Sequence, residues 1–310
     1  MFTLRQLRYL VALCDTLSFR RAAEVCLVAQ PTLSVQIRDL EDHLGVQLFE
    51  RTRRRVTLTP IGREIAERAR GVLRASQDIM DVARAASMPL AGPLRLGVIA
   101  TLGPYLLPYV LSAFREAHPD LRLYVREDPA RRLVGRLREG ELDVILVDMP
   151  VDLEGLDGLE LFQEPLWLAV PRGHRLEDAA SVSLTDLIGE DLLLLEEGHC
   201  LRQEVLTICQ RAGAHEHTGF QATSLDTLRQ MVASRIGPTI LPALYVAAEA
   251  AQDEQIRAIP FHEDCASVRR RVVLLWRVQS ARKQEFREFA AFIAARLPDH
   301  VICEIRPLQV

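Results

Sequence analysis

The chain has 310 residues, of which 49% are hydrophobic and 26% are charged, a composition typical of a folded protein of about two domains. No apolar run approaches the roughly 20 residues that a membrane-spanning helix needs. Arg5 and Arg8 also interrupt any apolar core of a signal peptide. These features predict a cytoplasmic protein without a membrane segment, a compartment in which structural disulfides are rare.

The net charge of −4 is unevenly distributed. Residues 1–75 contain thirteen arginines and eight acidic residues, a net charge of +5, which leaves −9 for the remainder. A basic N-terminal module on an acidic body indicates a polyanionic partner that binds only one domain.

The cysteines and histidines do not indicate a metal site. Six cysteines, at positions 14, 26, 200, 209, 265 and 303, show neither a CxxC pair nor zinc-finger spacing. His215 and His217 alternate in a polar segment that we interpret as a solvated loop. We therefore expect no metal and no cofactor.

The first 60 residues predict a helix-turn-helix. Apolar residues from Leu4 to Cys14 recur at helical spacing, and Ser18 has the chemistry of an N-cap for a second helix over 19–25. Pro31 suits the first turn of a third helix, which Gly45 ends. The start of this third helix is small and polar, as a helix that enters the major groove requires.

A basic turn follows. Residues 51–55 contain four arginines, and the alternating residues 56–59 predict a β-hairpin wing whose arginines suit phosphates or the minor groove. The predicted DNA-binding residues are Arg5, Gln30, Pro31, Thr32, Ser34, Arg38, Arg51 and Arg53.

Residues 1–60 resemble the winged helix-turn-helix of LysR-type transcriptional regulators. The resemblance lies in residues 4–10 (LRQLRYL), 18–23 (SFRRAA), 30–37 (QPTLSVQI), 40–41 (LE) and 48–51 (LFER). It implies that double-stranded DNA is the partner and that RNA polymerase is contacted during gene activation.

Residues 62–87 predict one continuous helix. Ile65, Val72 and Ile79 fall every seven residues, which is the spacing of a coiled-coil seam. A lone exposed helix of this length is marginal in water, so the pattern predicts a homodimer. The predicted domains are the DNA-binding domain at 1–60, a dimerising linker helix at 61–90 and an effector domain at 91–310.

The effector domain predicts an α/β fold. Strands over 94–99, 121–126 and 144–147 alternate with helices over 104–118 and 130–139, an order typical of a mostly parallel, doubly wound sheet. After a turn-rich stretch, a strand over 166–170 begins a second unit, and a strand over 271–276 and a helix over 283–295 follow it. We expect two lobes with a cleft between them, as in periplasmic-binding-protein-like domains. Lobe I spans about 91–165 plus 268–300, and lobe II spans about 166–267.

Two cysteines lie in one predicted helix of lobe II. Cys200 falls at its first turn, beside His199 and Arg202, where the helix dipole and a nearby cation favour the thiolate. Cys209 follows nine positions later, roughly 13 Å along the axis of a continuous helix. A disulfide needs Cα atoms within about 7 Å, so this pair bonds only if the helix unwinds. The alternative is that both thiols pack as small hydrophobic side chains.

The effector domain also resembles the LysR family, through residues 92–97 (GPLRLG) and 240–242 (ILP). Within the family it resembles the OxyR branch of hydrogen-peroxide sensors, through residues 101–108 (TLGPYLLP), 198–202 (GHCLR) with Cys209, and 222–229 (ATSLDTLR). The family resemblance further implies that dimers pair into a homotetramer.

The resemblance assigns roles to individual residues. Cys200 would be oxidised by peroxide and then form a disulfide with Cys209. Thr101, His199 and Arg270 would form the peroxide pocket, with Arg270 lowering the pKa of the thiol, although Arg269 and Arg271 leave the register open. Three positions depart from the branch: Ala130 replaces a threonine, Gln203 an aspartate and Arg235 a glycine. The first two are expected to weaken the polar surroundings of Cys200, and the sequence alone gives no effect for the third.

The leading hypothesis is therefore a peroxide-activated transcription regulator. One alternative is a LysR-type regulator that binds a small organic co-inducer in the cleft, with Thr101, Thr223 and Ser224 near helix N-termini holding a carboxylate. An enzyme is disfavoured, because the adjacent His199 and Cys200 rarely form a productive pair and nothing completes a triad.

Overall fold

The computed structural model describes residues 2–51, 56–87, 90–262, 265 and 267–308. It divides into two compact units, Met1–Ala86 and Ser87–Val310. None of the helices within the described ranges combines the length and the apolar character that crossing a membrane requires.

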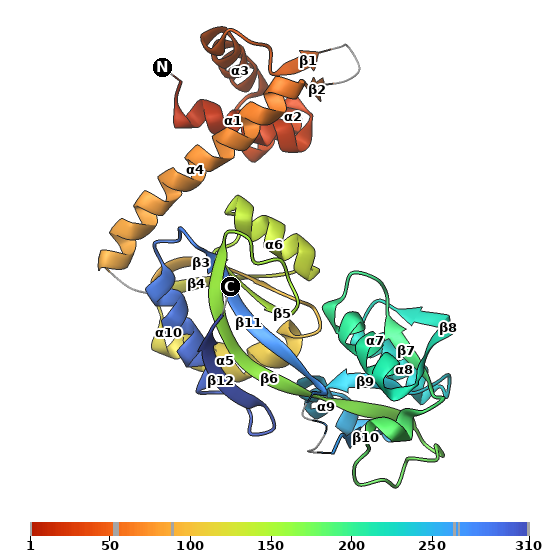
Figure 1. The fold of residues 1–310 in the computed structure, drawn as a ribbon. Coiled ribbons are helices and arrows are strands. Elements are labelled where there is room, and N and C mark those ends of the chain that lie inside the picture. The colour runs from red at the N-terminus through yellow and green to blue at the C-terminus, as the bar shows by residue number, and fades with distance from the viewer. Residues whose placement is uncertain (1, 52–55, 88–89, 263–264, 266, 309–310) are drawn as a thin grey trace. The chain divides into compact units, whose positions relative to one another are not determined.

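The N-terminal unit contains the predicted helix-turn-helix and wing (Figure 1). Its elements are α1 (Leu4–Thr16), α2 (Phe19–Val25), α3 (Gln30–Leu44), the antiparallel strands β1 (Phe49–Arg51) and β2 (Val56–Leu58), and α4 (Pro60–Ser87). The predicted caps are confirmed. The Ser18 hydroxyl accepts a hydrogen bond from the Arg21 amide, and Gly45 ends α3 with a φ of 69°.

One apolar core holds this unit together. Leu10 of α1 and Leu33, Ile37 and Leu40 of α3 are fully buried in it. Ala66 and Ala69 of α4 belong to the same core, so the first turns of the long helix are part of the DNA-binding unit. The small alanine side chains let α4 approach the other helices closely.

The second unit is an α/β domain whose elements are shown in Figure 1. Its strands are β3 (Gly92–Val98), β4 (Leu121–Glu127), β5 (Val144–Asp148), β6 (Leu156–Pro171), β7 (Asp191–Leu195), β8 (His215–Ala222), β9 (Thr239–Pro242), β10 (Ile256–Pro260), β11 (Arg269–Arg277) and β12 (Ile302–Pro307). Its helices are α5 (Gly103–Ala117), α6 (Ala130–Glu139), α7 (Cys200–Ala212), α8 (Leu225–Ala233), α9 (Ala243–Ala248) and α10 (Lys283–Ala294), with 3-10 helices at Leu184–Leu187 and Ala250–Gln252.

The sheet is mixed, so the prediction of a mostly parallel sheet is wrong. The strand order is β4-β3-β5-β11-β6-β9-β7-β8, with β10 and β12 also paired to β6. Strands β3, β4 and β5 are mutually parallel, as are β7, β8 and β9, but β11 is antiparallel to both β5 and β6. The two groups are joined by β11 and β6. Strand β11 is antiparallel to β5 of the first group, and β6 is antiparallel to β9 of the second.

Pairing between strands far apart in the chain also produces strand segments that the sequence analysis did not predict. Strand β6 begins at Leu156 rather than at 166, because residues 156–165 pair with β11 while residues 166–169 pair with β9. The segment of His215 and His217, predicted as a loop, is strand β8, held by β7. Strand β12 was not predicted, and it too pairs with β6.

This topology places several chain segments at the carboxyl ends of the strands in the first parallel group. Strand β3 ends next to Thr101, β5 ends at Asp148, and α6 begins at Ala130. In open α/β sheets, ligands bind outside the carboxyl ends of parallel strands. The first turn of α7 reaches the same place, which is where the candidate site lies.

Candidate redox site and DNA-binding surface

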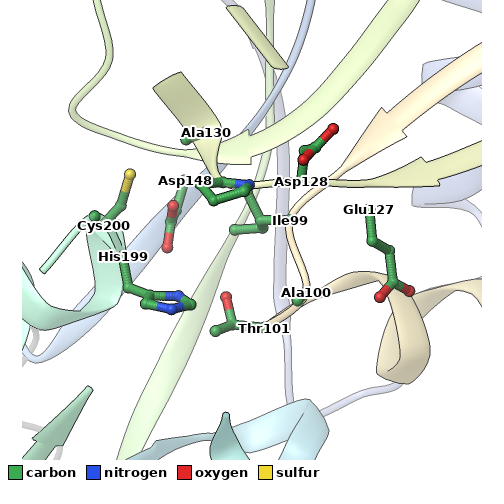
Figure 2. Close-up of a pocket in the computed structure, with 11 residues that line it drawn as sticks. Ile99, Ala100, Thr101, Glu127, Asp128, Ala130, Asp148, His199 and Cys200 are labelled. Atoms are coloured by element: carbon green, nitrogen blue, oxygen red, sulfur yellow. The ribbon is translucent and has the colours of Figure 1, made fainter. Parts of the chain in front are cut away.

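A cavity of about 290 Å³ lies where these segments meet (Figure 2). It is lined by Ile99, Ala100, Thr101, Glu127, Asp128, Pro129, Ala130, Asp148, Gly198, His199 and Cys200. The volume is at the lower end of the range for ligand pockets, which suits a small molecule. The structure thus brings together Thr101, His199 and Cys200, three of the predicted site residues.

Cys200 is the first residue of α7. The buried strand β7 precedes it, and Gly198 turns the chain with a φ of 101°, a conformation that favours glycine. His199 occupies the N-cap position without capping the helix through its side chain. The predicted helical face of Leu201, Val205 and Ile208 is buried, as expected.

The surroundings of the Cys200 thiol do not favour the thiolate. Burial raises the pKa of this thiol well above its ordinary value, and the carboxylate of Asp148 raises it further, while Arg270 only partly opposes the shift. A neighbouring cation, Arg270, and a backbone hydrogen bond at the helix start do lower the pKa, in the predicted direction, but the net shift is upward. Burial of the thiol, assisted by the negative charge of Asp148, outweighs both effects.

Arg202 is not the cation that the sequence suggested. Its guanidinium donates hydrogen bonds to the Leu195 carbonyl at 2.8 Å and to the Glu216 carboxylate at 2.9 Å. The side chain is buried in these contacts. Arg202 thus fixes the first turn of α7 to the ends of β7 and β8 instead of facing the thiol.

Of the three consecutive arginines at 269–271, Arg270 is the one whose side chain is fully buried. Its Nε donates to Glu164 at 2.7 Å, and its two terminal nitrogens donate to the Thr101 hydroxyl at 3.0 Å and the Thr101 carbonyl at 2.9 Å. Glu164 also accepts from the Leu244 amide at 2.7 Å. Arg270 is therefore held mainly by a fully buried partner of opposite charge.

Asp148 is the site residue that sequence reasoning missed. It is the last residue of β5, is fully buried and lines the cavity. Figure 2 shows its carboxylate among Cys200, His199 and Thr101, whereas Glu127 points away from them. Burial raises the pKa of this carboxyl, and the Arg270 charge and the Cys200 thiol oppose the shift. The available signal was a lone acidic residue closing the apolar strand 144–148.

Cys209 lies on the same helix as Cys200, and both are free thiols. Its side chain is packed in the core of the unit, and burial raises the pKa of its thiol to about 11. Nine residues of continuous helix separate the two sulfurs by roughly 13 Å along the axis. Neither can reach the other without unwinding α7.

The three departures from the family pattern lie in different places. Ala130 lines the cavity at the start of α6, but Gln203 is exposed on α7 and does not line the cavity. The expectation that Gln203 weakens the surroundings of Cys200 therefore stays a prediction. Arg235 has a φ of 60°, a left-handed conformation in which a side chain is strained and which glycine adopts freely.

Two residues of the co-inducer alternative lie elsewhere. Thr223 is exposed, and Ser224 caps α8 by accepting a hydrogen bond from the Thr227 amide at 3.2 Å. Neither lines the cavity of Cys200. The described residues contain no group of His, Cys, Asp and Glu side chains suited to a metal ion.

The DNA-binding candidates lie mostly on the surface of the N-terminal unit. Gln30, Pro31, Thr32 and Arg38 are exposed on α3, and Ser34 is half-buried there. Arg5 is exposed on α1 and donates a hydrogen bond to the Tyr9 hydroxyl at 2.6 Å. Arg51 ends β1, and Arg53 lies outside the described residues.

The seam residues of α4 differ in exposure. Ile65 packs against the core of the DNA-binding unit. Val72 and Ile79 are 45% and 70% exposed, large values for branched apolar side chains. The exposed part of the seam therefore begins after the first turns of the helix.

A winged helix-turn-helix followed by a two-lobed α/β effector domain defines a bacterial transcription regulator. Family models agree. The LysR substrate binding domain matches residues 88–298, and the bacterial regulatory helix-turn-helix protein of the lysR family matches residues 4–63.

The chain is 41% identical over 299 residues to the DNA-binding transcriptional dual regulator OxyR of Escherichia coli K12, covering 96% of each chain. It is 40% identical over 298 residues to the hydrogen peroxide-inducible genes activator of Dickeya chrysanthemi, covering 96% of this chain and 97% of that one. Its structure matches a full-length OxyR variant from Pseudomonas aeruginosa with a TM-score of 0.79 and 37% identity over 98% of both chains. The chain belongs to the LysR family and, within it, to the OxyR branch.

Proposed function

We propose that the protein is a transcriptional activator that senses hydrogen peroxide through Cys200 and Cys209. The observation that carries this proposal is the placement of Cys200 in a small cavity at one end of α7, with a second thiol buried further along the same helix. The relative from Dickeya chrysanthemi is named a hydrogen peroxide-inducible genes activator.

The chemistry requires two steps. Sulfur of Cys200 attacks one oxygen of the peroxide, the O–O bond breaks, and a sulfenic acid and water result. The Cys209 thiol then attacks the Cys200 sulfur, so that an S–S bond forms and a second water leaves. Peroxide is reduced by the two electrons that the two thiols lose.

The second step couples oxidation to a conformational change. Cys209 must leave the core and α7 must unwind before the two Cα atoms approach within about 7 Å. Unwinding removes the contacts that Arg202 makes with Leu195 and Glu216. We propose that this rearrangement changes how effector domains associate in a dimer and a homotetramer, and thereby the spacing of DNA half-sites.

The co-inducer alternative has less support. Glu127, Asp128 and Asp148 line the cavity, and a hydrogen bond from Arg126 holds the pKa of Asp128 below its ordinary value, so that carboxyl stays ionised. An anionic organic ligand would meet like charges there. Hydrogen peroxide is small and neutral, so these carboxylates would not repel it.

The remaining parts of the proposal concern partners. The exposed face of α3 and the wing would bind double-stranded DNA, and Val72 and Ile79 would pair two α4 helices. RNA polymerase would be contacted at activated genes in the cytoplasm. The protein would act as a regulator rather than as an enzyme, consuming one peroxide for each switching event.

The test is to count free thiols in the full-length reduced protein by alkylation and mass spectrometry, before and after one equivalent of peroxide. We expect two thiols to disappear and a linked peptide pair to contain Cys200 and Cys209. Cys209→Ser should stop at the sulfenic acid. Cys200→Ser should abolish the peroxide-dependent change in the DNA footprint.

Cys265→Ser is the matched control, because Cys265 is a half-buried thiol in the same unit away from the cavity. It should oxidise and shift its footprint like the unmodified chain. If peroxide leaves Cys200 reduced, or if the footprint of Cys200→Ser still responds, the proposed function is wrong. A footprint that shifts only with an added metabolite would favour the co-inducer alternative.

A further inference from the structure

Asp148 differs from other buried carboxylates of the effector unit. Glu164 is paired with Arg270, Glu160 with Arg271 and Glu285 with Arg282, each through a charge-assisted hydrogen bond. Neither carboxylate oxygen of Asp148 has a hydrogen-bond partner among the described residues, although the residue is fully buried. A buried carboxylate without hydrogen-bond partners is costly and therefore calls for an explanation.

Among the described residues, the cation that lies beside Asp148 is Arg270, which is already bound to Glu164. A terminal nitrogen of Arg270 lies 3.6 Å from Asp148, beyond hydrogen-bond distance, while Arg270 binds Glu164 at 2.7 Å. One guanidinium thus faces two carboxylates. Glu204, half-buried on α7, adds a third acidic group whose pKa is raised by burial and by Asp148.

The cavity therefore has a surplus of negative charge, which is unfavourable for a preformed thiolate. A thiol must nevertheless lose its proton before its sulfur attacks a peroxide. Cys200 and Asp148 both line the cavity, and Figure 2 shows the Asp148 carboxylate beside Cys200. His199 and Thr101 also face this space, and Thr101 is occupied as an acceptor for Arg270.

We propose that Asp148 is the proton-transfer residue for Cys200, accepting the thiol proton and then delivering it to the leaving oxygen of the peroxide. This inference rests on the proposed peroxide function. As sulfur bonds to one peroxide oxygen, the proton moves from sulfur to the Asp148 carboxylate. The O–O bond breaks, and the departing hydroxide takes that proton and leaves as water. The products are the sulfenic acid, one water and the original Asp148 carboxylate, so atoms and charge balance.

The test compares two reactions of the same thiol in full-length Asp148→Asn protein. Oxidation by hydrogen peroxide needs both a base and an acid, whereas alkylation by iodoacetamide needs only the base, because iodide leaves without a proton. Both rates are measured by quenched mass spectrometry of the Cys200 peptide between pH 6.5 and 8.5. Alkylation also reports whether the thiol and its cavity remain intact.

We expect peroxide oxidation of Asp148→Asn at pH 7 to be slower by about 100-fold, which is within the ordinary range for acid–base catalysis. The ratio of the oxidation rate to the alkylation rate should fall at least about tenfold, since loss of the acid affects only oxidation. The oxidation rate should also become steeply pH-dependent, because only solvent then deprotonates the thiol. Asp148→Glu should restore part of the ratio.

Asp128→Asn is the matched control, because Asp128 lines the same cavity but is paired with Arg126 and does not act on the thiol. Its rate ratio should match that of the unmodified protein. If Asp148 is only a repulsive charge, Asp148→Asn will speed both reactions and leave their ratio unchanged, which overturns the inference. If the unmodified protein does not oxidise at Cys200 at all, the proposed function itself fails, and that outcome is distinct.

Discussion

The two units of the protein bury different kinds of side chain. The DNA-binding unit has an apolar core, from Leu7 of α1 to Ala69 of α4. Among the described residues, every buried polar or charged side chain lies at Thr101 or beyond, in the effector unit. The functional candidates follow the same division, since those of α3 are largely exposed and those of the cavity are largely enclosed.

This difference follows from what each unit is proposed to do. A DNA-binding surface needs a rigid frame that presents polar side chains to solvent and to phosphates. A sensor of a small oxidant needs side chains that face a reactive thiol away from bulk water. Burial of charged groups lowers stability unless they are paired, so the effector unit is the more sensitive to loss of a single charge.

The largest effect should come from the buried charge cluster. Arg270→Met leaves Glu164 and Asp148 buried without their cation and should lower the free energy of unfolding by about 3–5 kcal/mol. Urea unfolding followed by the fluorescence of the buried Trp276 measures the loss. Arg271→Met is the control, because that side chain is half exposed, and its loss should be about 1 kcal/mol or less.

A second Arg270 variant checks the cause. Combining Arg270→Met with Glu164→Gln removes the uncompensated charge and should recover part of the stability. If Arg270→Met and Arg271→Met lower the free energy of unfolding equally, burial is not the reason that the Arg270 cluster matters for stability.

The next effect tests the apolar frame of the DNA-binding unit. A Cβ atom added at Gly62 would lie 2.2 Å from the Leu48 carbonyl oxygen, so α4 would have to move away from the wing. Gly62→Ala should lower stability by about 1–3 kcal/mol and weaken DNA binding. Thermal unfolding and a DNA-binding titration measure the two effects.

Gly71→Ala is the control for this prediction. It lies on the same helix, and the nearest atom to its Cβ would be the end of the flexible Arg74 side chain at 3.7 Å. It should raise stability by about 0.5–1 kcal/mol, because alanine has the higher helix propensity. A loss of stability in Gly71→Ala would instead assign the Gly62→Ala effect to the helix as a whole.

The smallest effect concerns backbone strain in the effector unit. Arg235→Gly should raise stability by about 0.5–1 kcal/mol, because glycine adopts the left-handed φ of 60° without strain. The melting temperature should rise by about 1–4 °C. Gly189→Ala, at a φ of 76° with open space around it, should shift the melting temperature in the opposite direction. Shifts of the same sign would rule out backbone strain as the cause.

The sequence by itself determined the local features. The helix boundaries of the DNA-binding unit, the Ser18 cap and the Gly45 terminus depend on residues close along the chain, and the structure confirms them. The start of α7 at Cys200 followed from the apolar strand and Gly198 in the same way. Family membership was also evident, because its motifs are short contiguous segments, and the comparisons confirm it.

Only the tertiary structure decided what surrounds Cys200. Arg202, two residues away in sequence, is turned towards Glu216, whereas Asp148, 52 positions earlier, raises the pKa of the thiol. The mixed sheet and the length of β6 likewise depend on strands far apart in the chain. Charge interactions and strand pairing act through space, so the charge balance of the site appears only when separate segments have been folded together.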